Sequence, residues 1–294
     1  MQTLTPWPHR AYVLLSRMLA LLPWLTSLYG ARMNPRVLVL RAAGTNCDAE
    51  TVYAFELAGA TTERLHVNRL AERPELMERF HILVIPGGFT YGDDVSAGKI
   101  LANELTTRLA EPLHRFVERG SLVLGICNGF QVVLKAGLLP GWDEPAPSFT
   151  LTDNLAGRFE DRWVWLQPSS PACVFTRGMA EPIYLPVAHG EGRFTATTSA
   201  ALDRLEADGQ VAFRYVDPQG GPVDYPANPN GSDRDIAGIC DPTGRVLGLM
   251  PHPERHAHPT QHPQWTRLGL ASEGHGLAIF RNAVRAAREV ELVS

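Results

Sequence analysis

Cys127 is the residue of this sequence that is best placed to act as a nucleophile. It directly follows an apolar run at residues 122–126, and Gly125 and Gly129 stand two positions before and after it. Glycines at this spacing let a chain turn sharply from strand into helix with the thiol exposed at the turn, which is the shape of a nucleophile elbow. The helix predicted over residues 128–136 would direct free N–H groups at the sulfur and favour the thiolate. The competing interpretation is a buried cysteine between two turn glycines.

Attack by this thiol on a carbonyl carbon would need backbone N–H groups that stabilise the oxyanion. The N–H of Asn128, directly after the nucleophile, is the first predicted donor. The second is expected in the Pro-Gly-Gly segment at residues 86–88, which follows a strand-like run at residues 81–85. Open α/β sheets place their sites at the carboxyl ends of strands, and glycines let an N–H approach a ligand closely. Gly87 and Gly88 are therefore predicted to line the site.

His252 and Glu254 can supply the base and its orienting carboxylate. They follow the apolar run at residues 246–250 and are two positions apart, which places them on one side of an extended chain. Pro253 fixes its own φ and favours extended geometry at His252. A carboxylate beside an imidazole holds the tautomer and orientation that a catalytic triad requires. The alternative is a surface loop with an incidental histidine and glutamate.

Two other patterns carry less chemistry. Residues 92–99 resemble a phosphate-binding loop, but Ile100 stands where Ser or Thr must bind Mg²⁺, so no ATP site is predicted. His256, His258 and His262 could bind a metal, but prolines interrupt any helical face that would align them, and no cysteine or paired acid completes the set. We predict no metal site and no cofactor in this chain.

Alternating strand-like and helical patterns supply the elements that must position these residues. Apolar runs typical of strands occur at residues 37–40, 81–85, 122–126, 163–166, 183–187, 211–215, 236–240 and 246–250. Helical patterns occur at residues 49–58, 101–119, 128–136 and 274–288. This alternation indicates βαβ units. We predict an α/β fold with a mainly parallel central sheet, flanked by helices and carrying the nucleophile elbow, in one domain over residues 33–294.

Composition excludes several classes of function. The chain has 294 residues, 45% of them hydrophobic and 20% charged, with a formal net charge of -4. It has no long run of Lys or Arg to bind nucleic acid, and its ordinary composition argues against a membrane protein. The four cysteines, at 47, 127, 173 and 240, form no Cys-x-x-Cys pair, so neither a zinc knuckle nor a disulfide framework is predicted. A small buried hydrophobe is the plainest interpretation of each.

The first 32 residues are interpreted separately. Residues 18–29 are apolar and follow basic residues, as in a secretory leader, but the run is too short to span a bilayer and lacks a small-x-small cleavage site. Met33 stands directly before the first strand-like run. We interpret residues 1–32 as an N-terminal extension or a mis-assigned start, which folding and activity do not need. We expect a cytoplasmic protein.

Taken together, the elbow and the His-Pro-Glu pair resemble the class I glutamine amidotransferases, which share a Gly-x-Cys-x-Gly-x-Gln elbow. Several stretches are similar, more narrowly, to the glutaminase subunits of phosphoribosylformylglycinamidine synthase. These stretches cover residues 44–48, 86–93, 125–131, 188–193, 228–232 and 251–255. The similarity runs from about Arg41 to Arg255. Ala43 and Ser96 depart from the family, which usually has Pro and Arg there, and this puts partner contacts and subfamily in doubt more than the chemistry.

The resemblance implies a class I amidotransferase fold that hydrolyses glutamine to glutamate and ammonia. It implies that a separate synthase subunit holds ATP and Mg²⁺, takes the ammonia and converts formylglycinamide ribonucleotide to formylglycinamidine ribonucleotide in purine biosynthesis. A small bridging subunit belongs to the same expectation. Carried over residue by residue, the resemblance implies that Cys127 is the nucleophile, His252 the acid/base and Glu254 its orienting carboxylate. It implies oxyanion donors at Gly88 and Asn128 and a substrate contact at Gln131.

Two matching motifs receive no role, namely His189 and the stretch from Asn228 to Ser232. The triad alone leaves open a γ-glutamyl hydrolase or an amidotransferase that serves a different pathway, which the purine-specific stretches disfavour. A scaffold without catalysis is the third interpretation, and the intact cysteine, histidine and glutamate argue against it.

Overall fold

The computed structural model describes residues 34–144 and 146–291, and from Pro35 onward the chain forms one compact unit. The predicted N-terminal extension, residues 1–32, lies outside the described residues. Among the described residues, no helix is both long and apolar enough to cross a membrane.

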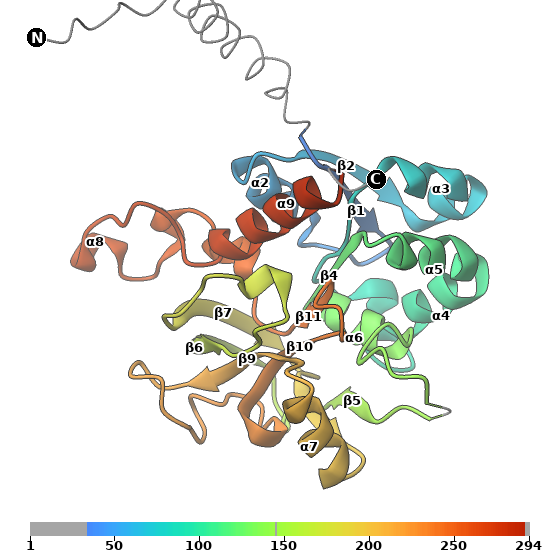
Figure 1. The fold of residues 1–294 in the computed structure, drawn as a ribbon. Coiled ribbons are helices and arrows are strands. Elements are labelled where there is room, and N and C mark those ends of the chain that lie inside the picture. The colour runs from blue at the N-terminus through green and yellow to red at the C-terminus, as the bar shows by residue number, and fades with distance from the viewer. Residues whose placement is uncertain (1–33, 145, 292–294) are drawn as a thin grey trace, which may run out of the picture. The chain divides into compact units, whose positions relative to one another are not determined.

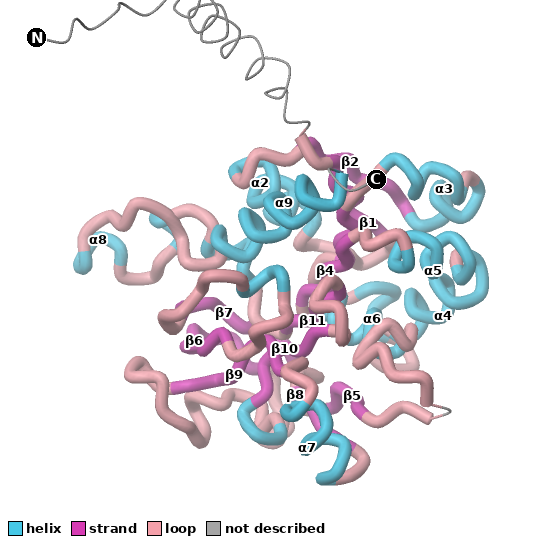
Figure 2. Tube along the Cα trace, in the orientation of Figure 1, coloured by secondary structure: helices cyan, strands magenta, loops and turns pink. Residues whose placement is uncertain are grey.

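A nine-stranded sheet forms the centre of this unit, in the order β2-β1-β3-β4-β11-β10-β9-β6-β7 (Figures 1 and 2). Its strands are β1 (Arg36–Arg41), β2 (Thr61–His66), β3 (Ile82–Ile85), β4 (Leu122–Ile126), β6 (Glu160–Pro168), β7 (Ile183–His189), β9 (Val211–Val216), β10 (Ile236–Cys240) and β11 (Val246–Leu249). A separate antiparallel pair consists of β5 (Phe149–Thr152) and β8 (Arg193–Ala196).

The sheet has two halves that differ in strand direction. Strands β2, β1, β3, β4 and β11 are all parallel, and we call them the parallel half. From β11 onward the pairings β11-β10, β10-β9, β9-β6 and β6-β7 are antiparallel, and β10, β9, β6 and β7 form the antiparallel half. The predicted α/β class is confirmed, and the sheet that was predicted to be mainly parallel is mixed, with a parallel and an antiparallel half.

Helices flank the parallel half. They are α2 (Asp48–Leu57), α3 (Val67–Glu72), α4 (Lys99–Arg108), α5 (Ala110–Glu118), α6 (Asn128–Lys135) and α9 (Leu277–Glu291). Phe55 of α2 and Phe280 of α9 pack edge to face with ring centroids 4.9 Å apart, which joins the two ends of the unit. Helices α7 (Ser199–Ala207) and α8 (Trp265–Leu268) come between α6 and α9 in the chain.

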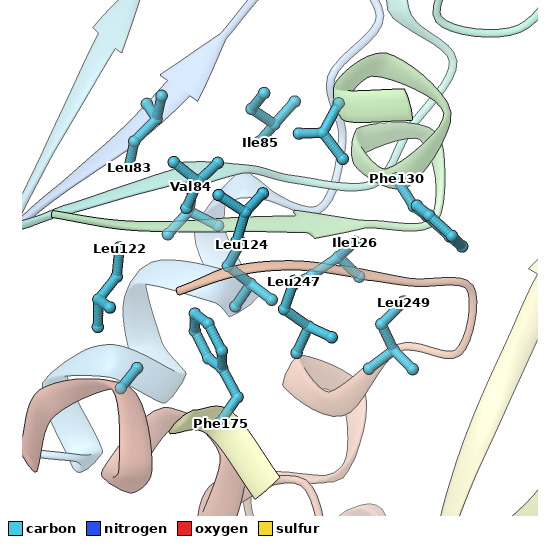
Figure 3. Close-up of a cluster of buried hydrophobic side chains, with 14 of the residues drawn as sticks. Leu83, Val84, Ile85, Leu122, Leu124, Ile126, Phe130, Phe175, Leu247 and Leu249 are labelled. Carbon is cyan, nitrogen blue, oxygen red and sulfur yellow. The ribbon is translucent and has the colours of Figure 1, made fainter. Parts of the chain in front are cut away.

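The core follows from strands that are buried on both faces. Every residue of β3, β4 and β11 is buried, as expected for apolar runs in the interior of a parallel sheet. Figure 3 shows Phe130 of α6 on one side of these strands and Phe175 on the other. All four cysteines are free and buried.

One predicted helix is divided in two. The pattern at residues 101–119 predicts a single helix, whereas α4 ends at Arg108 and α5 begins at Ala110. Pro112 lies in the first turn of α5, where its missing N–H is tolerated, but it could not donate to the carbonyl of Arg108 in a continuous helix. Leu109 sits at the junction with φ -125° and ψ 14°. The sequence patterns also missed β2, β5, β8, α3, α7 and α8.

Candidate active site

Cys127 lies at a strained turn between β4 and α6. Its φ is 51° and its ψ is -108°, a backbone conformation that side-chain-bearing residues rarely adopt. The Cys127 N–H donates to the carbonyl of Leu249 in β11 at 2.7 Å, which ties the turn to the neighbouring strand. Non-glycine residues held in such conformations cluster at functional sites. The predicted elbow is therefore present in the fold.

The glycines around the elbow are required by close backbone contacts. A Cβ placed on Gly129 would lie 1.8 Å from the carbonyl oxygen of Ile85, and one on Gly125 would lie 2.6 Å from that of Gly129. Both distances are far below any contact that a real Cβ makes. Strand β4, the start of α6 and the end of β3 can pack this closely because these residues have no side chain.

His252 and Glu254 leave the end of β11 and pair with each other in the interior. The Nδ1 of His252 and the Oε1 of Glu254 are 2.6 Å apart, and the two residues are 1% and 0% exposed. His252 is extended as predicted, with φ -104° and ψ 92°, and its N–H donates to the carbonyl of Pro186 at 2.8 Å. The strand geometry does not continue to the carboxylate, because Pro253–His256 forms a 3-10 turn. The 3-10 turn nevertheless brings the side chains of His252 and Glu254 into contact.

The surroundings of His252 favour its protonated form. Burial acts against the charge, but the Glu254 carboxylate, and after it Cys127 and Cys47, raise the pKa of His252 well above its usual range. Since Glu254 occupies Nδ1, Nε2 is the nitrogen that remains for proton exchange with Cys127. Among the described residues none hydrogen-bonds to this Nε2, and catalytic hydrogen bonds often tighten only when substrate is bound.

The predicted oxyanion donors lie on the loops that border the elbow. Gly88 has φ +147° and forms an isolated bridge with Thr45, which fixes the loop after β3. Asn128 is the first residue of α6, whose opening N–H groups have no acceptor within the helix. Gly87 faces the base, because a Cβ there would lie 2.7 Å from Cε1 of His252.

The side chains of Asn128 and Gln131 belong to a buried hydrogen-bond network. Asn128 accepts from the Thr90 hydroxyl at 2.5 Å and donates to Asp93 and to Gln131, both at 2.9 Å. Gln131 also donates to the carbonyl of Glu191. In this arrangement both side chains hold neighbouring loops beside the elbow, and the substrate contact assigned to Gln131 stays a prediction.

Cys47 is a functional candidate that the sequence patterns missed. They suggested only a small buried hydrophobe, whereas the structure places its Sγ 4.0 Å from Nδ1 of His252. Arg255 donates to the same sulfur at 3.1 Å. Cys47 directly precedes α2 and lies beyond the end of β1, at the same edge of the sheet as Cys127 and His252. Its position after a strand of the parallel half was the available signal.

The histidines after His252 have local structural partners. The Nδ1 of His256 lies 2.6 Å from the Tyr184 carbonyl, His258 accepts from the N–H of Thr260, and His262 accepts from that of Gln264. Of the groups of His, Cys, Asp and Glu in the described residues, one brings three ligand atoms within 4.8 Å of each other, and it consists of Cys47, His252 and Glu254. The Arg255 guanidinium beside Cys47 places a positive charge there, which disfavours a metal cation.

His189 and Asn230 form a buried network at the end of β7. His189 Nδ1 lies 3.0 Å from Oδ1 of Asn154, and Asn230 donates to the hydroxyl of Tyr215 at 3.2 Å. Burial, with His252 as a further cause, lowers the pKa of His189 to about 3, so this imidazole is neutral. The carbonyl of the preceding Ala188 faces the Cys127 thiol at 3.7 Å. The two motifs without a predicted role thus build the wall opposite the nucleophile.

Comparisons with known proteins agree with this geometry. A family model described as a CobB/CobQ-like glutamine amidotransferase domain matches residues 34–285. The phosphoribosylformylglycinamidine synthase subunit PurQ of Dehalococcoides mccartyi is 50% identical over 258 residues, which are 87% of this chain and 98% of that protein. The subunit of the same name from Methanococcus maripaludis strain S2 is 41% identical over 267 residues, which are 86% and 97% of the two chains.

Solved structures show the same relationship. A chain in the structure of PurLQS from Thermotoga maritima is 30% identical with a TM-score of 0.67, and the match covers 86% of this chain and 99% of that one. A glutamine amidotransferase from the same organism, 16% identical over 89% of this chain, shares the fold with a TM-score of 0.51. The resemblance inferred from the motifs is confirmed. The chain belongs to the glutamine amidotransferases and, within them, to the family of phosphoribosylformylglycinamidine synthase PurQ subunits.

Proposed function

We propose that this chain is the glutaminase subunit of a phosphoribosylformylglycinamidine synthase and that Cys127, His252 and Glu254 perform its chemistry. One observation carries the proposal: a cysteine on a strained strand-to-helix turn lies near enough to a buried histidine to raise its pKa, and that histidine is paired with a carboxylate at 2.6 Å. The PurQ relatives, which match over nearly their whole length, support the pathway in purine biosynthesis.

Catalysis begins when the Cys127 thiolate attacks the side-chain amide carbon of glutamine. The new carbon–sulfur bond places negative charge on the amide oxygen, which the N–H groups of Gly88 and Asn128 stabilise. The carbon–nitrogen bond then breaks, and the imidazolium of His252 gives its proton to the departing nitrogen as ammonia leaves. A thioester between Cys127 and the glutamyl group remains.

Hydrolysis of the thioester completes the cycle. His252, now neutral, takes a proton from water as the water oxygen attacks the thioester carbon. The carbon–sulfur bond breaks, glutamate leaves, and the pair of Cys127 thiolate and His252 imidazolium is restored. Glu254 holds the histidine tautomer and supports its positive charge in both steps.

The partner in this proposal is the synthase subunit, with a small bridging subunit as a third component. The matching chain from Thermotoga maritima belongs to a structure of PurLQS, which supports such an assembly. Ammonia must pass directly between the sites, because free ammonia is mostly protonated near neutral pH and would escape. We propose that ATP and Mg²⁺ bind to the synthase, and the proposal is supported by residues 92–100, which lack the Ser or Thr of a phosphate-binding loop.

A cytoplasmic location is part of the proposal. It is supported by four free cysteines, since thiols stay reduced in the cytosol. Cell fractionation of the native protein tests this point, and recovery from an exported fraction would contradict it.

The decisive experiment separates the two nitrogen sources. In the reconstituted complex, Cys127→Ser should abolish amidine formation from glutamine and leave formation from ammonium salt largely intact, because a hydroxyl stays protonated where a thiolate forms. Cys173→Ser, at a second buried cysteine, serves as the control.

Two outcomes would contradict the proposal. Equal loss with both nitrogen sources would mean that Cys127 supports assembly or the synthase step, and full activity with glutamine would mean that it is not the nucleophile. Fast hydrolysis of γ-glutamyl peptides without any glutamine-dependent synthesis would favour the γ-glutamyl hydrolase.

A further inference from the structure

The turn before α2 contacts both the oxyanion loop and the base. The N–H groups of Asn46 and Cys47 donate to the carbonyl of Gly87 at 3.4 and 3.2 Å, and the N–H of Phe89 donates to the carbonyl of Gly44 at 3.0 Å. The Cys47 sulfur reaches past Gly87, because a Cβ on that glycine would lie 3.2 Å from Sγ. Cys47 therefore lies between the segment that supplies Gly88 and the ring of His252.

Cys47 is also the anchor of Arg255. The guanidinium donates to Sγ at 3.1 Å, while its Nε lies 4.0 Å from Oε1 of Glu254 and 3.9 Å from Oε1 of Glu50. The thiol in turn donates to Oδ1 of Asn46 at 3.1 Å. Burial is the main cause that raises the pKa of the Cys47 thiol, so the sulfur is an uncharged acceptor at neutral pH. The positively charged Arg255 guanidinium is thus held next to the Glu254 carboxylate by the uncharged Cys47 sulfur.

We propose that Cys47 is a positioning residue, which holds the Arg255 guanidinium against its sulfur and keeps that cation from approaching Glu254 more closely than the 4.0 Å between Arg255 Nε and Glu254 Oε1. The inference rests on the proposed function, since it concerns the carboxylate that supports His252. If Arg255 paired closely with Glu254, the carboxylate charge would be divided between two cations. His252 would then be a weaker counter-ion for the Cys127 thiolate.

The charged and titratable groups around His252 define the expected pH behaviour. The groups are Cys127 at the elbow, Cys47 in the turn before α2 and His189 at the end of β7. Glu254 and Arg255 lie in the 3-10 turn, and Glu50 lies in α2. His189 is neutral, so the charges that control the protonation of His252 are those of Glu254 and Arg255. Weakening the Glu254 charge should lower the pKa of His252, so the imidazolium that the reaction needs is lost at a lower pH.

The test measures kcat/KM for glutamine hydrolysis by the reconstituted complex as a function of pH, a profile that is bell-shaped because the reaction needs both a thiolate and an imidazolium. For Cys47→Ala we expect a narrower bell, with the alkaline limb about one pH unit lower and the rate on that limb about tenfold lower. Cys47→Ser keeps an acceptor for Arg255 and should retain most of the wild-type profile. Cys173→Ala, at a buried cysteine outside the site, should match the wild type.

The double variant separates positioning from packing. If Cys47 acts by holding Arg255, then Cys47→Ala with Arg255→Ala should regain a broad bell, because no cation remains to pair with Glu254. If Cys47 only fills space, the double variant should be as impaired as Cys47→Ala or worse, and the inference is wrong. A Cys47→Ser profile as narrow as that of Cys47→Ala would also overturn it.

Failure of this inference can be told apart from failure of the proposed function. Alkylation of Cys127 by iodoacetamide should abolish glutamine hydrolysis in the wild type whatever the role of Cys47. If the alkylated enzyme still hydrolyses glutamine, Cys127 is not the nucleophile. If alkylation abolishes hydrolysis but the profiles of the Cys47 variants match the wild type, only the positioning role is lost.

Discussion

The parallel half of the sheet positions the reactive groups of the site, whereas the antiparallel half supplies buried neutral side chains beside them. Each reactive or positioning group of the site follows a strand of the parallel half: Cys47 after β1, Gly88 after β3, Cys127 after β4 and His252 after β11. The antiparallel half supplies His189 and Tyr215, which are buried, hydrogen-bonded and neutral. Parallel strands bring loops that are distant in sequence to one edge, whereas the antiparallel strands form the wall that encloses it.

This difference gives a general expectation for variants. Changes at the carboxyl ends of the parallel half should lower the rate of glutamine hydrolysis more than stability, and changes in the buried network of the antiparallel half should do the reverse. Four substitutions test that expectation, in order of decreasing effect.

Glu254→Gln should give the largest loss. The amide keeps the shape but removes the charge that supports protonated His252, and the equivalent change in serine triads costs up to about 10⁴-fold in rate. Steady-state glutamine hydrolysis measures the loss, and circular dichroism checks the fold. Glu111→Gln, at an exposed carboxylate of α5 that pairs with Arg115, is the matched control. An unchanged rate in correctly folded Glu254→Gln would remove this carboxylate from the mechanism.

Gly129→Ala should reduce activity by about 100-fold, since a misplacement of about 1 Å at a reacting group costs that much. The added Cβ meets the Ile85 carbonyl at 1.8 Å, so the elbow must shift. Gly137→Ala, just beyond the end of α6, adds a Cβ at positive φ with nothing within 4 Å and should leave the rate close to wild type. Equal losses in both variants would show that general helix strain, and not the close contact at the elbow, is responsible.

His189 should make the protein less stable in acid. Its pKa in the folded state, about 3, lies below the usual 6.5, so the unfolded chain binds the extra proton and stability falls as pH drops below about 6.5. Between pH 7 and pH 5 this residue should cost about 2 kcal/mol, at about 1.4 kcal/mol per pH unit.

Urea unfolding at the two pH values measures this loss, which should be smaller by that amount in His189→Gln. His114→Gln, at an exposed histidine of α5, should keep the wild-type loss. His256 and His275, whose pKa values are also lowered, leave a residual slope in every variant. If His189→Gln loses as much stability as the wild type, His189 is not the acid-sensitive group.

Tyr215→Phe should have the smallest effect. It removes the hydroxyl that accepts from Asn230, a loss of about 1 kcal/mol in the free energy of unfolding. The rate of glutamine hydrolysis should stay near that of the wild type, because the buried Tyr215 hydroxyl accepts from Asn230 and has no role in the proposed mechanism. Tyr53→Phe, at an exposed tyrosine of α2, controls for loss of a hydroxyl alone. A large fall in the rate of hydrolysis without a fall in stability would show that Tyr215 contributes to catalysis, as the residues of the parallel half do.

The sequence predicted the parts of the site whose signal is local. The Cys127 turn and the His252–Glu254 pair each follow an apolar run directly, so spacing and residue type were sufficient. Cys47 was missed because its contact with His252 joins positions 205 residues apart, and only the order of β1, β3, β4 and β11 brings them together. The sequence predicted a mainly parallel sheet but not which strands are antiparallel, since apolar runs do not reveal strand direction.

The missed elements have physical reasons of their own. Strand β2 lies at the edge of the sheet and has the sequence TTERLH, which shows no regular alternation of apolar and polar residues. Strand β5 has four residues, as does β8, so each is too short to establish a pattern. The break between α4 and α5 was foreseeable from Pro112, because a proline ends or divides a helical pattern.

The different exposure of the four cysteines allows the intact site to be counted with a thiol reagent. Cys127 is 5% exposed at the apex of the elbow, whereas Cys47, Cys173 and Cys240 are 0%, 1% and 0% exposed. A small thiol reagent should therefore consume one equivalent rapidly from the native protein and the other three only after denaturation. In a fully intact preparation one thiol in four reacts rapidly, so a departure of the fast-to-total ratio from one quarter reveals damaged or unfolded chains, and specific activities can be compared between batches.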